Sequence, residues 1–308
     1  MIFVFSENIE TAIELLAKGR EIADTLKSEL AAISIERHGK EETYIAYGAD
    51  TVYSIDSEPQ ADLVVDCIFS LTNQNKPEIL LIGGTKLGRE VAPRIAQRFG
   101  VGCATDCIDL SIEQEQLIVK RFVLGGRFIA TQRFLHKPRI VTIPPRRFEK
   151  KLDTNRNGEI IENTLKVAKS RVLVLEIKDK TSQALKIEEA DIIVSVGRGL
   201  KKKEDLNLVE SLAKILGGAL GCSRSVAADL KWLPEEHWVG LSGHKVKPKL
   251  YIAVGISGQA QHIAGIRDAK TIIAINNDPN APIFKACDYG IVGDLYEIVP
   301  ELVATLKA

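Results

Sequence analysis

The sequence lacks several features that mark particular classes of protein. Its 41 lysines and arginines equal its 41 aspartates and glutamates, so the chain as a whole is not built to bind nucleic acid or an anionic membrane. No apolar run approaches the ~20 residues that span a bilayer. The first residues, MIFVFSENIE, have neither the charged start nor the longer apolar stretch of a secretory signal. We therefore expect a cytoplasmic protein that is not embedded in a membrane.

Recognisable metal and redox motifs are also missing. The five cysteines are odd in number and scattered, and the closest pair, Cys103 and Cys107, has neither redox nor zinc-site spacing. Buried free thiols in a reducing compartment are the better interpretation. The five histidines include no H-E-x-x-H pair. We expect no metal site.

What is present is an ordinary soluble composition, 45% hydrophobic and 27% charged, in a chain of 308 residues that can form two domains. The first third alternates short apolar runs with stretches of helical spacing. These patterns predict strands at 2–5, 30–35, 51–55 and 77–82, and helices at 11–26, 62–71 and 88–99. Such alternation is typical of an α/β fold with a mainly parallel sheet flanked by helices.

The middle of the chain has a different pattern. Residues 117–124 and 127–133 predict a hairpin around Gly125-Gly126. Ten lysines or arginines and one acid lie between residues 120 and 151. Two interpretations stay open: a solvated hairpin and linker, or a contact with an acidic partner or a cofactor phosphate. An apolar run at 172–177 predicts one more strand, and a polar, helix-capable segment follows at 179–190. We place the domain boundary there, giving domains 1–178 and 179–308.

In the second domain, strands are predicted at 192–196, 251–254, 271–275 and 289–292, with a helix at 206–216. Ligands of open parallel sheets bind beyond the carboxyl ends of the strands. Glycines at 255 and 258 would let a ligand approach the backbone closely. Each polar residue near such an end could be a simple cap or surface group, but five loop ends carry groups suited to a dinucleotide: Ser223 with Arg224, Ser242, Ser257, Asn276 and Asp294.

These motifs carry a resemblance to a known family. The run from GRGLKKKED through SGHKVKPKLYIAVGISGQAQHIAG to DYGIVGDLYEIVPEL is similar to the FAD-binding domain of the alpha subunit of electron-transfer flavoproteins. The stretch PEILLIGGTKLGREVAPRIAQRFGVGCATDC has the family's glycine, arginine and proline pattern in the first domain. The resemblance implies two α/β domains, the second a Rossmann-like unit that binds FAD.

The resemblance also implies a role. The protein would be an electron carrier rather than a substrate-converting enzyme, with no catalytic residue of its own. Its first domain would be a platform for the beta subunit in a heterodimer. Flavin-dependent dehydrogenases would donate electrons, and an acceptor such as a membrane quinone reductase would take them.

The positions that match FAD-contacting residues of the family lie on six segments. Arg224 and His262 match the residues that flank the isoalloxazine ring, where a cation and a donor favour reduced flavin. At Leu241 the family usually has Gln, and at Ser242 it usually has Thr. Leu cannot hydrogen-bond the flavin, which puts the redox tuning in question. The matching positions are Arg198, Ser223, Arg224, Val239, Gly240, Leu241, Ser242, Ser257, Gly258, Gln259, Ala260, Gln261, His262, Asn276, Asp294 and Leu295.

Two other interpretations compete. An NAD-dependent enzyme with a Rossmann-like domain would account for the strand–loop–helix at 251–265, but that loop has no G-x-G-x-x-G and no catalytic acid–base pair accompanies it. A nucleotide-binding regulatory protein is the other. For such a protein the stretch Gly83-Gly84-Thr85-Lys86 in the first domain is the feature of interest, although it is not an intact phosphate loop.

Overall fold

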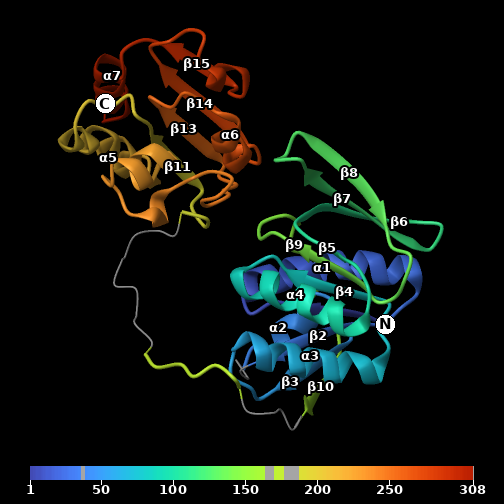
Figure 1. The fold of residues 1–308 in the computed structure, drawn as a ribbon. Helices are drawn as coiled ribbons and strands as arrows, with labels where there is room; N and C mark the ends of the chain where they lie inside the picture. Colours follow the sequence, from blue (N-terminus) through green and yellow to red (C-terminus); the bar gives the residue numbers. More distant parts are fainter. Residues whose placement is uncertain (36–38, 164–169, 177–186, 308) are drawn as a thin grey trace. The chain divides into compact units, whose positions relative to one another are not determined.

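Two units make up the chain in the computed structural model, which describes residues 1–35, 39–163, 170–176 and 187–307 (Figure 1). The first unit is Met1–Ile177 and the second is Lys178–Ala308. The boundary predicted between residues 178 and 179 lies outside the described residues, as does most of the helix predicted at 179–190.

The first unit is built on a seven-stranded parallel sheet with the order β10-β3-β2-β1-β4-β9-β5. Because β1 has β2 on one side and β4 on the other, the chain winds outward in both directions from the centre of the sheet. The strands are β1 (Ile2–Phe5), β2 (Leu30–Ile35), β3 (Thr51–Ile55), β4 (Ile79–Gly83), β5 (Cys103–Ala104), β9 (Arg139–Ile143) and β10 (Glu159–Asn163).

Alternate residues of these strands fill two separate cores. Ile2 and Val4 belong to one core and Phe3 and Phe5 to the other, because successive side chains of a strand point to opposite faces. Both faces are therefore covered, as parallel sheets require. Helices α1 (Ile9–Leu26) and α2 (Glu41–Ala46) contribute to the first core, and α3 (Ala61–Asn75) and α4 (Lys86–Phe99) to the second.

A separate antiparallel sheet of three strands completes the first unit (Figure 1). It consists of β6 (Cys107–Glu113), β7 (Gln116–Val123) and β8 (Phe128–Arg133). The predicted hairpin is β7–β8, and Gly125 and Gly126 both have positive φ in its turn. Strand β8 is solvent-accessible along its whole length, and Phe128 and Ile129 are exposed.

The second unit has a five-stranded parallel sheet with the order β12-β11-β13-β14-β15. Its strands are β11 (Ile192–Val196), β12 (Ala219–Cys222), β13 (Leu250–Val254), β14 (Thr271–Asn276) and β15 (Tyr289–Val292). Helices α5 (Leu206–Ile215) and α7 (Leu295–Lys307) share one core, and α6 (Ala260–Ile266) borders the site described below. A π-helical turn (Ser225–Asp229) and three 3₁₀ turns (Lys203–Asp205, Glu235–His237, Pro282–Lys285) connect these elements.

The predicted fold class is confirmed, and several elements differ from the prediction; β6, β10, β12 and α2, for example, were not predicted. The strand predicted at 172–177 is wrong for the described residues 172–176: they form no strand, and Leu173 and Leu175 are exposed. An apolar run becomes a strand only where a neighbouring strand and a core receive it. Conversely, the buried strand β9 was not predicted, because RIVTI lies between Pro138 and Pro144 in the basic stretch. Within the described ranges, no helix has the length and apolarity needed to cross a membrane.

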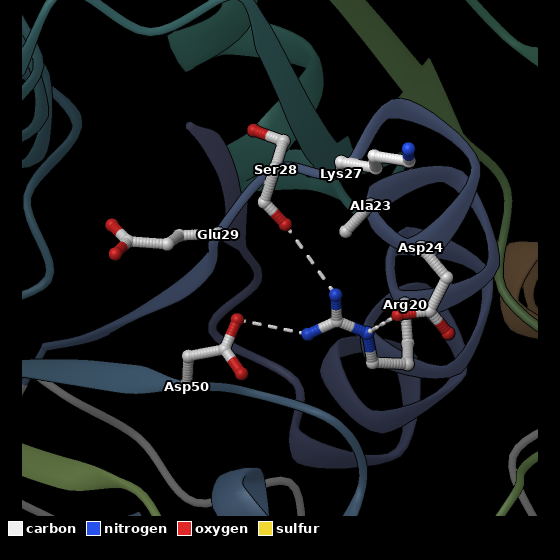
Figure 2. A pocket seen from close by; sticks show the side chains of 7 residues that line it. All are labelled: Arg20, Ala23, Asp24, Lys27, Ser28, Glu29 and Asp50. Atoms are coloured by element: carbon white, nitrogen blue, oxygen red, sulfur yellow. Dashed lines mark hydrogen bonds and ion pairs between the residues drawn. The ribbon is translucent and has the colours of Figure 1, made fainter.

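A network of charges joins α1 to the edge of the first sheet. Figure 2 shows the depression where it lies. Arg20 donates through Nε to Asp24 (2.8 Å) and through Nη1 to Asp50 (2.8 Å). Asp50 also accepts from the Leu30 amide (2.9 Å) and from Arg156. These groups satisfy one another, so we assign the depression a structural role.

Asp50→Ala should lower the free energy of unfolding by about 2–3 kcal/mol, because the Leu30 amide and two guanidinium groups lose their acceptor. Asp24→Ala is the matched control: it removes an exposed partner of the same arginine and should cost at most ~1 kcal/mol. Urea unfolding followed by circular dichroism measures both. The fluorescence of Trp232 and Trp238, the chain's 2 tryptophans, reports on unfolding of the second unit. The urea midpoint of this fluorescence transition should not change in either variant.

The same carboxylate makes this difference depend on pH. Burial raises the pKa of Asp50, but the Leu30 amide and the guanidinium groups of Arg20 and Arg156 lower it by more, so it lies below the ordinary 3.8. A lowered folded-state pKa gives stability that is present above the unfolded pKa and lost as pH falls through the folded pKa. The cost of Asp50→Ala should be complete above about pH 5 and shrink in stronger acid. A cost that stays constant across the acid range would contradict this account.

Candidate functional site

The second sheet changes winding direction between β11 and β13, and two glycine-rich loops meet there. β11 neighbours both β12 and β13, so the strands that follow it lie on opposite sides. In parallel sheets of this kind the ligand crevice lies at the carboxyl ends of the strands at this point. The Gly197 amide donates to the Val254 carbonyl (2.9 Å), and the Gly199 amide to the Gly255 carbonyl (3.1 Å). A Cβ on Gly197 would lie 2.2 Å from the Gly255 oxygen. Only glycine permits this approach.

The loop after β13 is held from the other side. Gly258 has φ +80°, and a Cβ there would lie 2.3 Å from the Ile283 amide nitrogen. That amide donates to the Ser257 carbonyl (3.0 Å). Helix α6 then begins at Ala260, while the side chains of Ser257 and Gln259 remain exposed at the crevice. The backbone of this loop is therefore held in place, while the side chains of Ser257 and Gln259 remain accessible to a ligand.

A third loop, residues 238–244, joins this region to the end of β12. The Val239 amide donates to the Cys222 carbonyl (2.9 Å), and the Leu241 amide to the Gln261 carbonyl (2.7 Å). Gly240 backs directly onto α6, where a Cβ on Gly265 would lie 2.6 Å from the Gly240 Cα. Three predicted segments are thus brought together: the end of β12, the 239–242 loop and the 257–262 segment, which contains His262. Leu241 and Ser242 are exposed on this loop.

Arg224 brings a positive charge to the end of β12. Its side chain is exposed, and its Cζ lies 5.8 Å from the centroid of the Trp238 ring. A guanidinium over an indole face is attracted by the ring quadrupole, which limits where the charge can go. Next to it, the hydroxyls of Ser223 and Ser225 are 2.9 Å apart. Trp238 was not predicted from the sequence, although an aromatic residue directly before the predicted contact Val239 was an available signal.

His262 differs from the other site residues because it is buried, with 8% of its surface exposed. Its Nε2 lies 3.0 Å from the Tyr251 hydroxyl. Burial lowers the pKa of His262 to about 4, and the backbone of Val239 only partly offsets this. The imidazole is therefore neutral near pH 7. The positive charge expected at this site comes from Arg224, and His262 supplies a neutral hydrogen-bonding group.

The remaining predicted residues lie at the ends of other strands and have local structural partners. Asn276 donates to the Ile256 carbonyl (2.9 Å), and Asp294 accepts from the Tyr296 amide (2.9 Å) at the start of α7. The Leu295 side chain is buried beneath Gly255, and Arg198 is exposed. The cap and turn roles considered from the sequence are thus present.

The set of residues fits an extended ligand. Neighbouring strands are about 4.8 Å apart, so the row from β12 to β15 spans ~19 Å, more than a single nucleotide covers. The glycines leave room for backbone contact. His262 Nδ1 is buried and makes no hydrogen bond of normal geometry with the described residues, although the Val239 backbone acts on the ring. A ligand beside Nδ1 would complete its hydrogen bonding. These features match the FAD that the sequence resemblance implies.

The stretch Gly83-Gly84-Thr85-Lys86 of the first unit is a poorer candidate for a ligand site. Thr85 accepts from the Gly88 amide (3.0 Å) as the cap of α4, and its hydroxyl donates to the Glu7 carboxylate (2.8 Å). The Gly84 amide donates to the Ile143 carbonyl (2.6 Å). A phosphate at this helix start would meet the Glu7 carboxylate, which disfavours a nucleotide there.

Comparison with known proteins agrees with these observations. The family described as "Electron transfer flavoprotein domain" matches residues 8–168, and "Electron transfer flavoprotein FAD-binding domain" matches residues 186–267. The chain is 38% identical to the electron transfer flavoprotein subunit alpha of Thermoanaerobacterium thermosaccharolyticum, over 99% of this chain and 97% of that one. The subunit alpha of Clostridium acetobutylicum is also 38% identical, over 100% and 97%. Protein FixB of Azotobacter vinelandii is 39% identical, over 96% and 86%.

These matches confirm the resemblance drawn from the sequence, and they do not support the alternatives of an NAD-dependent enzyme or a regulatory protein. The chain belongs to the electron transfer flavoprotein family as an alpha subunit, an electron carrier that works through FAD and not a substrate-converting enzyme.

Proposed function

We propose that the residues predicted from the sequence, from Arg198 to Leu295, hold FAD along the carboxyl edge of the second sheet. Arg224 and His262 would lie beside its isoalloxazine ring. The observation that carries this proposal is the meeting of three loops around the Gly197–Gly255 approach, next to a buried histidine whose Nδ1 makes no hydrogen bond of normal geometry with the described residues. When bound, FAD supplies the redox chemistry, because its ring accepts and releases electrons.

The residues of the chain have distinct tasks in this proposal. The permanent charge of Arg224 favours the more negative form of a ligand beside it. His262 contributes a hydrogen bond in a poorly hydrated position, where such a bond is strongest. The hydroxyl of Ser242 is available at the exposed loop, whereas Leu241 can offer only apolar contact. Leu241 therefore removes one polar contact that the family usually has.

Gly255→Ala should weaken FAD binding about tenfold to a hundredfold, because its Cβ would lie 2.8 Å from the Gly199 Cα and force the two loops apart. The test is to co-express the full chain with a beta subunit and measure the flavin absorbance per protein after dialysis against decreasing FAD.

Gly217→Ala is the matched control for this variant. Gly217 has φ +63°, close to the +60° of Gly255, so alanine meets a similar backbone strain at either position. A Cβ at Gly217 would touch nothing within 4 Å, and the residue follows α5 at the opposite edge of the sheet. Equal FAD loss in the two variants would sink the crevice assignment, and a wild-type complex without FAD would overturn the whole proposal.

We further propose that a beta subunit docks on the first unit at the apolar hairpin β7–β8. Leu124, Phe128 and Ile129 are exposed together there, and large exposed apolar side chains grouped on one element mark interaction sites. Three lysines of the nearby basic stretch are already neutralised: Lys137 pairs with Glu78, Lys150 with Glu10 and Lys151 with Glu21. That pairing favours the solvated interpretation of those lysines, and it leaves apolar contact as the main attraction.

Phe128→Asp should prevent a stable one-to-one complex with the beta subunit, because it places a charge in an apolar contact. Phe128 is 60% exposed, so the variant should fold as the wild type does. Leu175→Asp is the control, because it places the same charge at an exposed leucine that is not on the hairpin. Leu175 is 88% exposed. It follows Ser170, whose hydroxyl donates to Asp62 of α3. Gel filtration of co-expressed chains decides. Loss of the complex in both variants, or in neither, would argue against the hairpin.

The finer assignments extend this proposal. Electrons would come from flavin-dependent dehydrogenases and pass to an acceptor such as a membrane quinone reductase, in the cytoplasm. The family resemblance supports this chain of carriers, and the exposed flank of Arg224 is consistent with electron exchange at a protein surface.

A further inference from the structure

One polar pair behind the crevice has no role in the account so far. Tyr251 lies in the middle of the second sheet, in β13, and its side chain is completely buried. Its hydroxyl is 3.0 Å from His262 Nε2, and the two rings are tilted by 57° with centroids 6.1 Å apart. A buried phenol is usually hydrogen-bonded, because leaving it unpaired costs about 1–3 kcal/mol.

The direction of this hydrogen bond follows from the partners present. Burial raises the pKa of Tyr251, so its hydroxyl keeps its proton. The Ser195 hydroxyl also acts on the phenol and lowers its pKa, as a donor to the phenol oxygen does, so among the described residues His262 Nε2 is the acceptor left for the phenol proton. A neutral imidazole has one N–H and one bare nitrogen. If Nε2 accepts, the imidazole proton must be on Nδ1.

We propose that Tyr251 is a positioning residue that fixes His262 in the tautomer with its proton on Nδ1, and so aims a neutral N–H donor at the cofactor. This rests on the proposed FAD site. Nδ1 is buried and makes no hydrogen bond of normal geometry with the described residues, and the backbone of Val239 raises the imidazole pKa as a hydrogen-bond acceptor does, so it is the protein group that competes with the cofactor for this proton. A donor there suits a carbonyl oxygen whose negative charge increases on reduction.

The two components of the pair come from elements that are fixed independently. Tyr251 is set by the pairing of β13 with β11 and β14, and His262 by the first turn of α6, where its amide donates to the Gln259 carbonyl (2.8 Å). The donor is thus held both by the sheet, through Tyr251, and by the first turn of α6. Because the hydrogen bond at one ring nitrogen decides which nitrogen carries the proton, the pair sets the donor before any ligand binds.

The tautomer can be measured directly in the full chain without FAD. With ¹⁵N-labelled histidine only 5 residues contribute, and the variant His262→Gln assigns the signal. Near pH 7 the wild type should show a protonated Nδ1 and a bare Nε2. A wild-type His262 with its proton on Nε2 would overturn the proposal, and this result does not depend on whether FAD binds.

Tyr251→Phe should release the tautomer, so that His262 shows a proton on Nε2 or a mixture of both forms. Tyr289→Phe is the matched control, since Tyr289 is an exposed tyrosine of the same sheet and its removal should leave the imidazole unchanged. An unaltered tautomer in Tyr251→Phe would refute the positioning role.

The link to the cofactor is tested in the complex with FAD and a beta subunit. Tyr251→Phe should stabilise reduced over oxidised FAD about tenfold less than the wild type does, a fall of ~59 mV for a one-electron couple. Tyr289→Phe should leave the potential unchanged. If the tautomer changes and the potential does not, the aim at the cofactor is refuted while the proposed function stands. If the wild type binds no FAD, the proposed function fails and the tautomer result remains.

Discussion

The candidate site depends on how closely two backbone segments approach at the centre of the second sheet. Gly197 and Gly255 end adjacent parallel strands, and there is no room for a side chain between them. Because these loops close on each other, the next loop turns outward and starts α6, which places His262 against Tyr251. The loop after β12 then rests on α6 through the Leu241 amide. The positions of His262 and of the loop after β12 therefore depend on the close approach of Gly197 and Gly255.

Burial separates the tasks of two residues that the sequence presents as a pair. Arg224 is exposed, keeps its charge and is oriented by Trp238. His262 is buried, and the resulting fall of its pKa leaves it neutral near pH 7. A fixed charge at the rim and a neutral donor inside give the site polarity without placing two cations together. The sequence names both residues but contains no information on their solvation.

The sequence predicts most of what depends on local pattern. The strands at 30–35 and 51–55 have the predicted bounds, because their apolar runs are short and ended by polar residues. It predicts less of what depends on distant partners. Strand β9 is buried by β4 and β5, and residues 172–176 stay exposed despite a more apolar sequence. Tyr251 was missed for the same reason, because it acquires its role from the distant residue His262. Trp238, in contrast, lies directly before the predicted contact Val239 and could have been found from that position.

The most direct test of this account is amide hydrogen exchange on the full chain with a beta subunit, comparing the FAD-loaded with the FAD-free complex. The account predicts added protection in the loops after β11, β12 and β13, at residues 197–199, 223–226, 239–243 and 255–262, with little change across the first sheet. Protection concentrated in the first unit around Thr85, with the loops of the second sheet unchanged, would contradict it.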